Sequence, residues 1–423
     1  MMIFNTQNRK IFRMYQVLLA AFSVVATNLP AQLRPIEIPQ IGKPVVSTHS
    51  AAIDAGDYVY VSGQGGQRPD GSMSEKFEEQ ATQALENIKA IVTTAGLDMQ
   101  HIVYVQVYLE DVSNYDQLNT VFAKYFPSTA PARAVLGVSR VSESSIVINA
   151  VAVRDLTDRK AVIPPNYKST EPFSPGILTH DRLFVSAMQG RDTLANTIPA
   201  DPAAQTDLAL DGVKAVVEAA GLNLANMVFV NPYLTTKIPM QVMNEHYARR
   251  FEFGNTPARA TIEVSALPHH AQIEYTGVAV RDMSLRHAVR PKNMPPSPTA
   301  SPCVFAGATL YCSAKSGFIP GPHGGVYGNS TAVQLRQTMR NQLDNLEEAG
   351  MDFSQVVSTT VYLDNLTDSG AFNKVYTEYF KSPLPARTML QQIPSSDRTP
   401  DTQGHFPDLE QMSLIAVKQI PKN

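Results

Sequence analysis

The chain has 423 residues, a length that indicates roughly two to four domains. Its formal net charge is −3, and its Lys and Arg residues form no basic stripe. Because nucleic-acid binding needs clustered positive charge, this argues against a nucleic-acid partner. The body of the chain has no apolar stretch of about 20 residues, the length that crosses a bilayer.

The first 32 residues differ from the rest. Arg9, Lys10 and Arg13 precede an apolar run over residues 17–26, and small residues follow. This pattern predicts a secretory signal over residues 1–32, with an uncleaved anchor or a wrongly assigned start as alternatives. We therefore expect a secreted or periplasmic protein without a membrane association after cleavage. Residues 34–45 have no periodic pattern and predict an extended lead-in.

The next 120 residues predict a small α+β unit. Gly56-Asp57 reads as the turn of a first hairpin, and Gly96 stands where a helix C-terminal cap belongs. Alternating apolar residues indicate strands, and apolar stripes of 3.6-residue period indicate helices. The predicted order is β-β-α-β-α-β-β, with strands at 51–53, 58–62, 102–109, 134–138 and 146–153 and helices at 75–95 and 115–126.

This unit occurs three times. The tripeptide Pro-Ala-Arg ends at Arg133, Arg259 and Arg387, which lie 126 and 128 residues apart. An Ala-Gly step and a Tyr-Leu pair recur at nearly the same interval. A repeat of this length is a domain rather than a solenoid unit, so the sequence predicts three tandem domains at 36–156, 163–284 and 295–420.

Each domain should form one α+β layer. A single sheet with two amphipathic helices places both helices on one sheet face. The other face is apolar enough to need a cover. Three copies in one chain suggest that these faces cover one another.

The two cysteines belong to the first hairpin of the third repeat. Alignment of Ser313 with Ser62 places a two-residue turn at Gly307-Ala308, where Gly in first position suits type II′ geometry. Pairing outward from this turn sets Cys303 opposite Cys312, within disulfide range. In an oxidising compartment we predict a cross-strand disulfide, with two buried free thiols as the alternative.

The pattern of residues resembles a known family. Ser62-Gly63-Gln64, Ala95-Gly96-Leu97, a Val-Tyr-Leu strand, Pro-Ala-Arg and a closing strand ending in Ala-Val are similar to the RidA/YjgF family over about 120 residues of each repeat. Members of that family are usually homotrimers with helices outside and ligand clefts at subunit boundaries. The resemblance therefore implies a chorismate-mutase-like α+β fold, packed as an intrachain pseudo-trimer and monomeric in solution.

The resemblance also implies a reaction. Family members hydrolyse reactive 2-imino acids, such as 2-iminobutanoate and 2-iminopropanoate, or their enamines, to keto acids and ammonia. The arginine of Pro-Ala-Arg holds the substrate carboxylate, a role that suits a planar guanidinium with paired N–H donors. This assigns a small carboxylate-bearing molecule to Arg133, Arg259 and Arg387, and we expect no cofactor and no metal ion.

One family feature is missing where we expected it. The resemblance places a water-activating glutamate on the closing strand, and the positions that we matched to it are Asn149, Thr276 and Ser413. Amides and hydroxyls can hold a water but cannot take its proton near neutral pH. Glu274 shares the strand face of Thr276, and we interpret it as solvent-facing, with substitution for the missing glutamate as the alternative.

Other cleft residues follow from the resemblance. A first-strand aromatic is matched by His49 in repeat 1 and Phe173 in repeat 2, and has no clear match in repeat 3. A strand-end histidine outside any site is the alternative for His49. Cleft serines and helix asparagines are matched by Ser62, Ser186, Ser313, Asn119, Asn244 and Asn373, the asparagines being equally open to a helix-surface role.

The function remains open between two classes. One is hydrolytic deamination of small imino acids, and the other is binding of small carboxylates without catalysis. An endoribonuclease is less favoured because basic patches are missing. His269-His270 lie in a predicted turn with no third metal ligand at useful spacing. Residues 395–406 form a polar insertion that we interpret as a loop able to cover a cleft.

Overall fold

The structure is a computed structural model. It describes residues 33–37, 48–142, 144–165, 167–168, 170–192, 195–321 and 324–419. The predicted signal lies outside these residues, as does most of the lead-in. Over the described ranges, no helix is both long and apolar enough to cross a membrane.

Repeat 1 forms a six-stranded sheet in the order β1-β2-β3-β7-β4-β5. Every predicted element is present, with its ends within two residues of the prediction. Gly96 has a φ of 76°, as expected for the residue that ends the long helix. The elements are β1 (Arg34–Ile36), β2 (Ala52–Asp54), β3 (Tyr58–Gln64), α2 (Phe77–Thr94), β4 (Ile102–Leu109), α3 (Tyr115–Tyr125), β5 (Ala132–Gly137) and β7 (Ile146–Val153).

Repeat 2 has the same plan. Its long helix begins as the sequence suggests, with the Asp201 side chain accepting from the Ala203 N–H and Pro202 in the first turn. The elements are β8 (Lys160–Val162), β9 (Gly176–Leu178), β10 (Arg182–Gln189), α4 (Pro202–Ala219), β11 (Met227–Leu234), α5 (Met240–Ala248), β12 (Ala258–Arg259), β13 (Ile262–Glu263) and β14 (Ile273–Val280).

Repeat 3 adds a small hairpin, β18 with β19, ahead of its long helix. β6 (Arg140–Val141) of repeat 1 joins the sheet of repeat 3 by pairing with β21. The elements are β15 (Arg286–Val289), β16 (Cys303–Ala306), β17 (Thr309–Ser316), β18 (Ile319–Gly321), β19 (Gly324–Val326), α6 (Thr331–Glu348), β20 (Val356–Leu363), α7 (Ser369–Tyr379), β21 (Ala386–Gln391) and β22 (Glu410–Val417).

Two features differ from the prediction. Each sheet has an extra leading edge strand, β1, β8 or β15, of only three or four residues. So short a run shows no alternation, which explains why the sequence did not reveal it. The β18–β19 hairpin was also missed. Residues 395–406 form a loop as predicted, and Arg398 ties this loop to Asp364 and Asp368 of its own repeat.

The cysteine hairpin has the predicted register. Cys303 pairs with Cys312 and Ala306 with Thr309 across the turn, and the two cysteines form a disulfide. Gly307 has a φ of 60°, the positive value that the first position of a type II′ turn requires. The prediction of a disulfide is confirmed.

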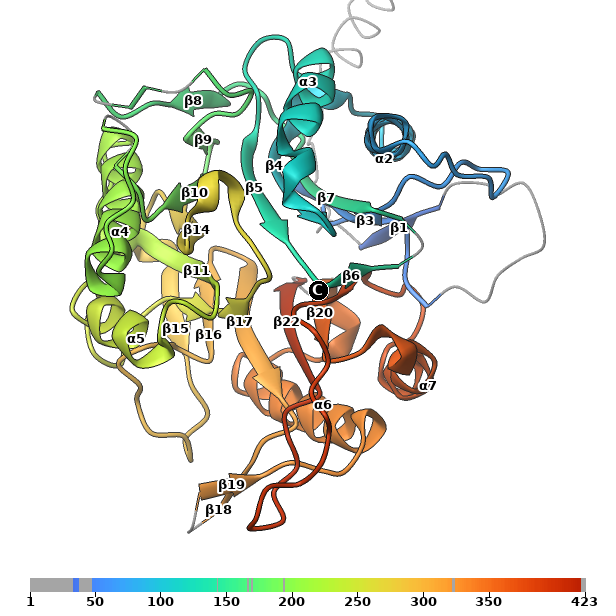
Figure 1. Ribbon diagram of the computed structural model, residues 1–423, viewed down its shortest axis with the longest axis vertical. Coiled ribbons are helices and arrows are strands. Elements are labelled where there is room, and N and C mark those ends of the chain that lie inside the picture. The colour runs from blue at the N-terminus through green and yellow to red at the C-terminus, as the bar shows by residue number, and fades with distance from the viewer. Residues whose placement is uncertain are drawn as a thin grey trace, which may run out of the picture. The chain divides into compact units, whose positions relative to one another are not determined.

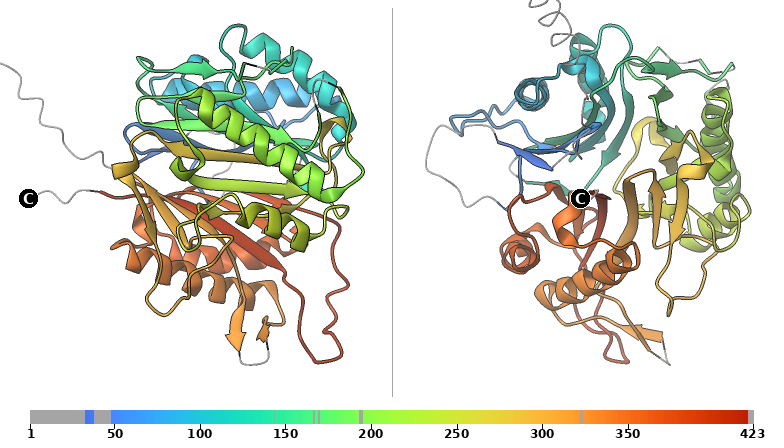
Figure 2. Two further views of the ribbon diagram at one scale, coloured as in Figure 1. Left: turned by 90° about the vertical axis from the view of Figure 1, so that its left-hand side faces the viewer. Right: turned by 180° about the vertical axis from the view of Figure 1, so that it is seen from behind.

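The three repeats pack around a pseudo-threefold axis. The helices cover the outer faces of the sheets and the inner faces turn toward one another (Figures 1 and 2). One apolar core draws on all three sheets, with Tyr58, Phe184 and Tyr311 among its members. The main chain closes the ring, because the N–H groups of Ser174, Ser301 and Ser50 donate to the carbonyls of Pro131, Pro257 and Pro385, respectively.

Candidate active site at the boundary of repeats 1 and 2

The three Pro-Ala-Arg arginines lie where one repeat meets the next. The backbone N–H of Arg133 donates to Ser186 Oγ of repeat 2, that of Arg259 to Ser313 of repeat 3, and that of Arg387 to Ser62 of repeat 1, each at 2.8 Å. Each serine hydroxyl in turn donates to a carbonyl 12 residues earlier. These serines are buried. In this structure they join the repeats, and ligand contact by their hydroxyls stays a prediction.

Arg133 is held rigidly by its own repeat. Its Nη2 donates to Asn119 Oδ1 at 2.6 Å and to Tyr115 Oη at 3.2 Å. The rings of Phe122 and Phe173 lie 4.7 and 5.2 Å from the guanidinium carbon, so Phe173 occupies the cleft as predicted. Arg133 is only 2% exposed, and its Nη1 has no hydrogen-bond partner among the described residues. A buried, unpaired donor of this kind is costly unless an acceptor binds there.

A cavity of about 920 Å³ opens in front of this arginine. Both repeats contribute to it, so it is a cleft between domains rather than a hole within one. Its lining includes Tyr115, Arg133 and Val135 of repeat 1 and Lys168, Glu171, Phe173, Gln189, His269 and Glu274 of repeat 2.

Glu274 lies inside this cavity and is fully buried. Its Oε2 accepts from Gln189 Nε2 at 3.2 Å, and its Oε1 has no partner among the described residues. Burial raises the pKa of Glu274 to about 8, against an opposing effect of Gln189 and Arg133. The interpretation of Glu274 as a solvent-facing residue was therefore wrong. Its strand face turns toward repeat 1 instead of toward water.

The three positions matched to the family glutamate lie elsewhere. Asn149, Thr276 and Ser413 line a cavity of about 100 Å³ between the three sheets, together with residues such as Tyr104 and Tyr362. We had matched the family glutamate to positions two residues too far along the closing strand. In repeat 2 the residue that lines the Arg133 cavity is Glu274 and not Thr276. A step of two residues along a strand keeps the sheet face but moves about 7 Å, here from the cleft to the axis.

The Arg259 and Arg387 sites are built differently. Arg259 Nη1 donates to Asn244 Oδ1 at 2.8 Å, in the same way that Arg133 uses Asn119. Arg387 instead donates to Thr48 Oγ1 at 2.7 Å, and Asn373 Oδ1 is buried without a partner among the described residues. Asn119 and Asn244 thus contact the arginines themselves.

His49 lies near Arg387. Burial, and secondly the charge of Arg387, lower the pKa of His49 to about 4. The imidazole is therefore neutral near pH 7. The strand-end alternative, with His49 outside any site, does not describe this environment.

Sequence analysis missed one pair in the Arg133 cavity. His269 Nε2 lies 2.7 Å from Glu171 Oε1. The predicted turn is present as the 3₁₀ helix η4 (Pro268–His270), but it carries His269 into the cavity lining. No signal marked this pair, because the turn has no counterpart with histidine in the other repeats.

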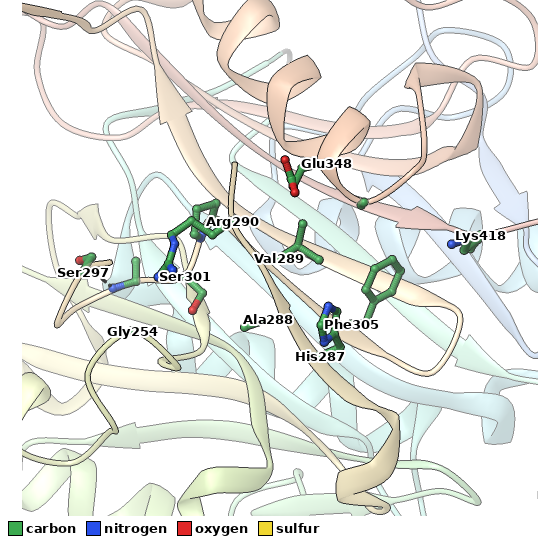
Figure 3. A pocket seen from close by; sticks show the side chains of 13 residues that line it. Gly254, His287, Ala288, Val289, Arg290, Ser297, Ser301, Phe305, Glu348 and Lys418 are labelled. Atoms are coloured by element: carbon green, nitrogen blue, oxygen red, sulfur yellow. Dashed lines mark hydrogen bonds between the residues drawn. The ribbon is translucent and has the colours of Figure 1, made fainter. Parts of the chain in front are cut away.

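A second cavity, of about 430 Å³, lies between β15, β16 and the end of α6 (Figure 3). Arg290 and Lys418 stand on opposite sides of it, and both are exposed. It contains none of the Pro-Ala-Arg arginines and no buried charged group. We therefore place the candidate active site at Arg133.

Comparison with known proteins agrees with this arrangement. The sequence profile described as endoribonuclease L-PSP matches three segments of the chain, residues 42–154, 165–281 and 293–393. The chain belongs to this family. The resemblance to RidA/YjgF proteins is thereby confirmed, and the chain is a tandem array of three RidA-like α+β domains.

Relatives of this family match one repeat at a time. A RutC family protein of Aquifex aeolicus is 34% identical over 126 residues, 29% of this chain and 100% of that protein. The human 2-iminobutanoate/2-iminopropanoate deaminase is 36% identical over 91 residues, 22% of this chain and 66% of that protein.

Solved structures of the family match in the same way. RidA from an Antarctic Psychrobacter is 34% identical with a TM-score of 0.27, covering 28% of this chain and 99% of that chain. E. coli TdcF with bound serine is 30% identical with a TM-score of 0.26, covering 29% and 98%.

Proposed function

We propose that the cleft between repeats 1 and 2 hydrolyses small 2-imino acids, or their enamine tautomers, to 2-keto acids and ammonia. The observation that carries this proposal is the pair of unsatisfied buried groups in one cavity, Arg133 Nη1 and Glu274 Oε1. One group can bind a carboxylate, and the other can accept a proton. The human relative named as a 2-iminobutanoate/2-iminopropanoate deaminase supports the choice of reaction.

The chemistry follows from these two groups. The substrate carboxylate binds Arg133, whose guanidinium is pre-oriented by Asn119 and Tyr115. Ionised Glu274 takes a proton from a water as the water oxygen attacks C2 of the iminium. The tetrahedral adduct then receives that proton on nitrogen and collapses, so that iminium and water become keto acid and ammonium. A pKa of about 8 suits a group that both accepts and returns a proton.

One chain should hold the whole site. Because the three repeats close on one another through the serine and proline contacts, no second copy is needed to supply Arg133 or Glu274. We therefore propose that the monomer is the active unit.

The decisive experiment follows the decay of enzymatically generated 2-iminopropanoate. Wild-type protein is expected to accelerate the decay, and Arg133→Met is expected to abolish most of this acceleration. Arg259→Met, which alters a cleft whose closing strand has Gln411 at the position of Glu274, serves as the matched control. Equal decay rates with and without wild-type protein would remove the proposal.

The second candidate is carboxylate binding without catalysis. Arg387 favours it, because this arginine is 7% exposed and its Nη1 has no partner among the described residues. The relative crystallised with bound serine also supports it, since serine carries a carboxylate. Calorimetric binding of 2-keto acids by a protein without imine turnover would select this candidate.

A further inference from the structure

Resting on the proposed function, we infer that His269 is a positioning residue that holds the Glu171 carboxylate away from Arg133 and so keeps the arginine free for the substrate. The Arg133 cavity contains an acidic residue that could occupy the arginine itself. Glu171 enters from the start of repeat 2, two residues before Phe173, whose ring packs on the guanidinium. A carboxylate so placed competes directly with a substrate carboxylate.

Glu171 and Arg133 are linked through Tyr115. Arg133 Nη2 donates to Tyr115 Oη at 3.2 Å, and the same hydroxyl hydrogen-bonds the Glu171 side chain. Glu171 and Arg133 therefore share one neighbour, the Tyr115 hydroxyl. A carboxylate that reaches a guanidinium forms a strong and often two-pronged ion pair, so Glu171 is a potential competitor for Arg133.

His269 provides the alternative partner. Its Nε2 lies 2.7 Å from Glu171 Oε1, and its ring stands edge-on to the Tyr115 ring at 5.2 Å between centroids. Burial acts to raise the pKa of Glu171, but the close contact with His269, together with Tyr115 and Arg133, holds that pKa below its usual value. Glu171 therefore remains a carboxylate, and its Oε1 lies against His269.

The turn that carries His269 has an unusual backbone conformation. His269 and His270 have φ values of 58° and 60°, in the left-handed region that non-glycine residues rarely adopt. Such conformations persist where surrounding contacts enforce them, and they concentrate at functional sites. The turn is attached to the cavity wall, because Gln189 Nε2 donates both to the Pro268 carbonyl and to Glu274.

The test is a mutant cycle read by binding rather than by turnover. Pyruvate affinity is measured by calorimetry for wild type, His269→Ala, Glu171→Gln and the double variant. We expect His269→Ala to weaken pyruvate binding about tenfold, which is 1.4 kcal/mol. Glu171→Gln should bind pyruvate at least as tightly as wild type, and the double variant should recover to within about twofold of it, because a neutral amide does not compete for a cation.

A merely structural role would give another pattern. If His269 only supported the fold, the double variant would bind as weakly as His269→Ala, and this result would overturn the inference, as would unchanged binding in His269→Ala. His269→Gln, which retains a donor for Glu171, should keep most of the affinity, and thermal unfolding reports whether each variant is folded. In imine kinetics the His269→Ala defect should appear in KM and spare kcat.

The two hypotheses fail in different ways. A wild-type protein that binds no pyruvate overturns both the proposed function and this inference. Pyruvate binding with the expected mutant cycle, but without imine turnover, overturns only the proposed reaction.

Discussion

The boundaries between repeats at Arg133 and at Arg387 share several contacts but differ in the groups opposite the arginine. In both, Pro-Ala-Arg meets the next repeat through the same serine contact, and an aromatic ring packs on the guanidinium. Across the Arg133 cleft the closing strand carries Glu274. Counted back from the final Ala-Val pair, the corresponding residue on the closing strand of repeat 1 is Val147.

This difference predicts that carboxylate binding occurs at both arginines and imine hydrolysis at Arg133. At both sites a buried guanidinium has a free donor that can bind a carboxylate, but among the described residues the cavity at Arg133 also holds Glu274, whose Oε1 has no partner and can take a proton. Covalent linkage of the repeats permits this, because each cleft can change without the other two. A homotrimer would change all three together.

The largest expected effect comes from Glu274→Gln. Loss of a general base reduces turnover by about 100-fold or more. Imine decay should fall accordingly while pyruvate binding persists. Glu410→Gln is the control, since Glu410 is also buried with a pKa raised by burial to about 8 but bonds Thr338 in the helix core of repeat 3. A Glu274→Gln protein with wild-type turnover would contradict the assigned base.

The two arginines should then prove unequal. Arg133→Met is expected to remove both imine turnover and one pyruvate site. Arg387→Met should remove a pyruvate site with far less effect on turnover, because Val147 stands at the position of Glu274 on the closing strand of the repeat that meets Arg387. Calorimetric stoichiometry beside imine kinetics measures both quantities. Equal turnover losses in the two variants would mean that the clefts are catalytically equivalent.

The pH dependence of turnover sharpens the comparison. Glu274 must be ionised to accept a proton, and burial raises its pKa to about 8. The ratio kcat/KM should therefore rise with pH and level off above about pH 8. This limb should vanish in Glu274→Gln. A profile that is flat between pH 6 and 9 in wild type would argue against Glu274.

His49, which matches Phe173 and lies near Arg387, should make stability depend on pH. The pKa of His49 falls from 6.5 to about 4 on folding, through burial and the charge of Arg387. The unfolded chain therefore binds a proton first as pH falls, so its contribution to stability is full above pH 6.5 and is lost between 6.5 and 4. This loss is at most about 3 kcal/mol by linkage.

Urea unfolding at pH 7 and pH 4 measures this contribution. His49→Phe should lose less stability than wild type over that interval. If wild type and His49→Phe lose equal stability between the two pH values, His49 has an ordinary pKa in the folded protein.

The smallest expected effect is the loss of stability on removing the disulfide, which lies in neither the Arg133 nor the Arg387 site. Cys303 and Cys312 close a short loop, so the double change to Ala should cost only about 2 kcal/mol. Urea unfolding measures the cost, and imine turnover should be unaffected. Thiol titration of the unfolded, unreduced protein should find no free thiol, and two thiols per chain would contradict the bridge.

Local pattern was enough for most of the fold. The apolar stripes of α2 and α3, the cap at Gly96 and the Cys303–Cys312 register depend on neighbours within one helix or hairpin, and each was predicted correctly. The edge strands β1, β8 and β15 were missed because three or four residues show no period and depend on the strand beside them.

By itself the sequence determined that three similar α+β domains follow one another and that each contains one Pro-Ala-Arg motif. Repetition and periodicity are properties of the order of residues, so they can be read without a structure. Only the tertiary structure decided which groups face each arginine. Glu274, Glu171 and His269 meet Arg133 from another repeat, and whether a strand glutamate faces water or a cavity depends on which sheet covers it. Glu274 is 141 residues from Arg133 along the chain, a separation over which local pattern carries no information.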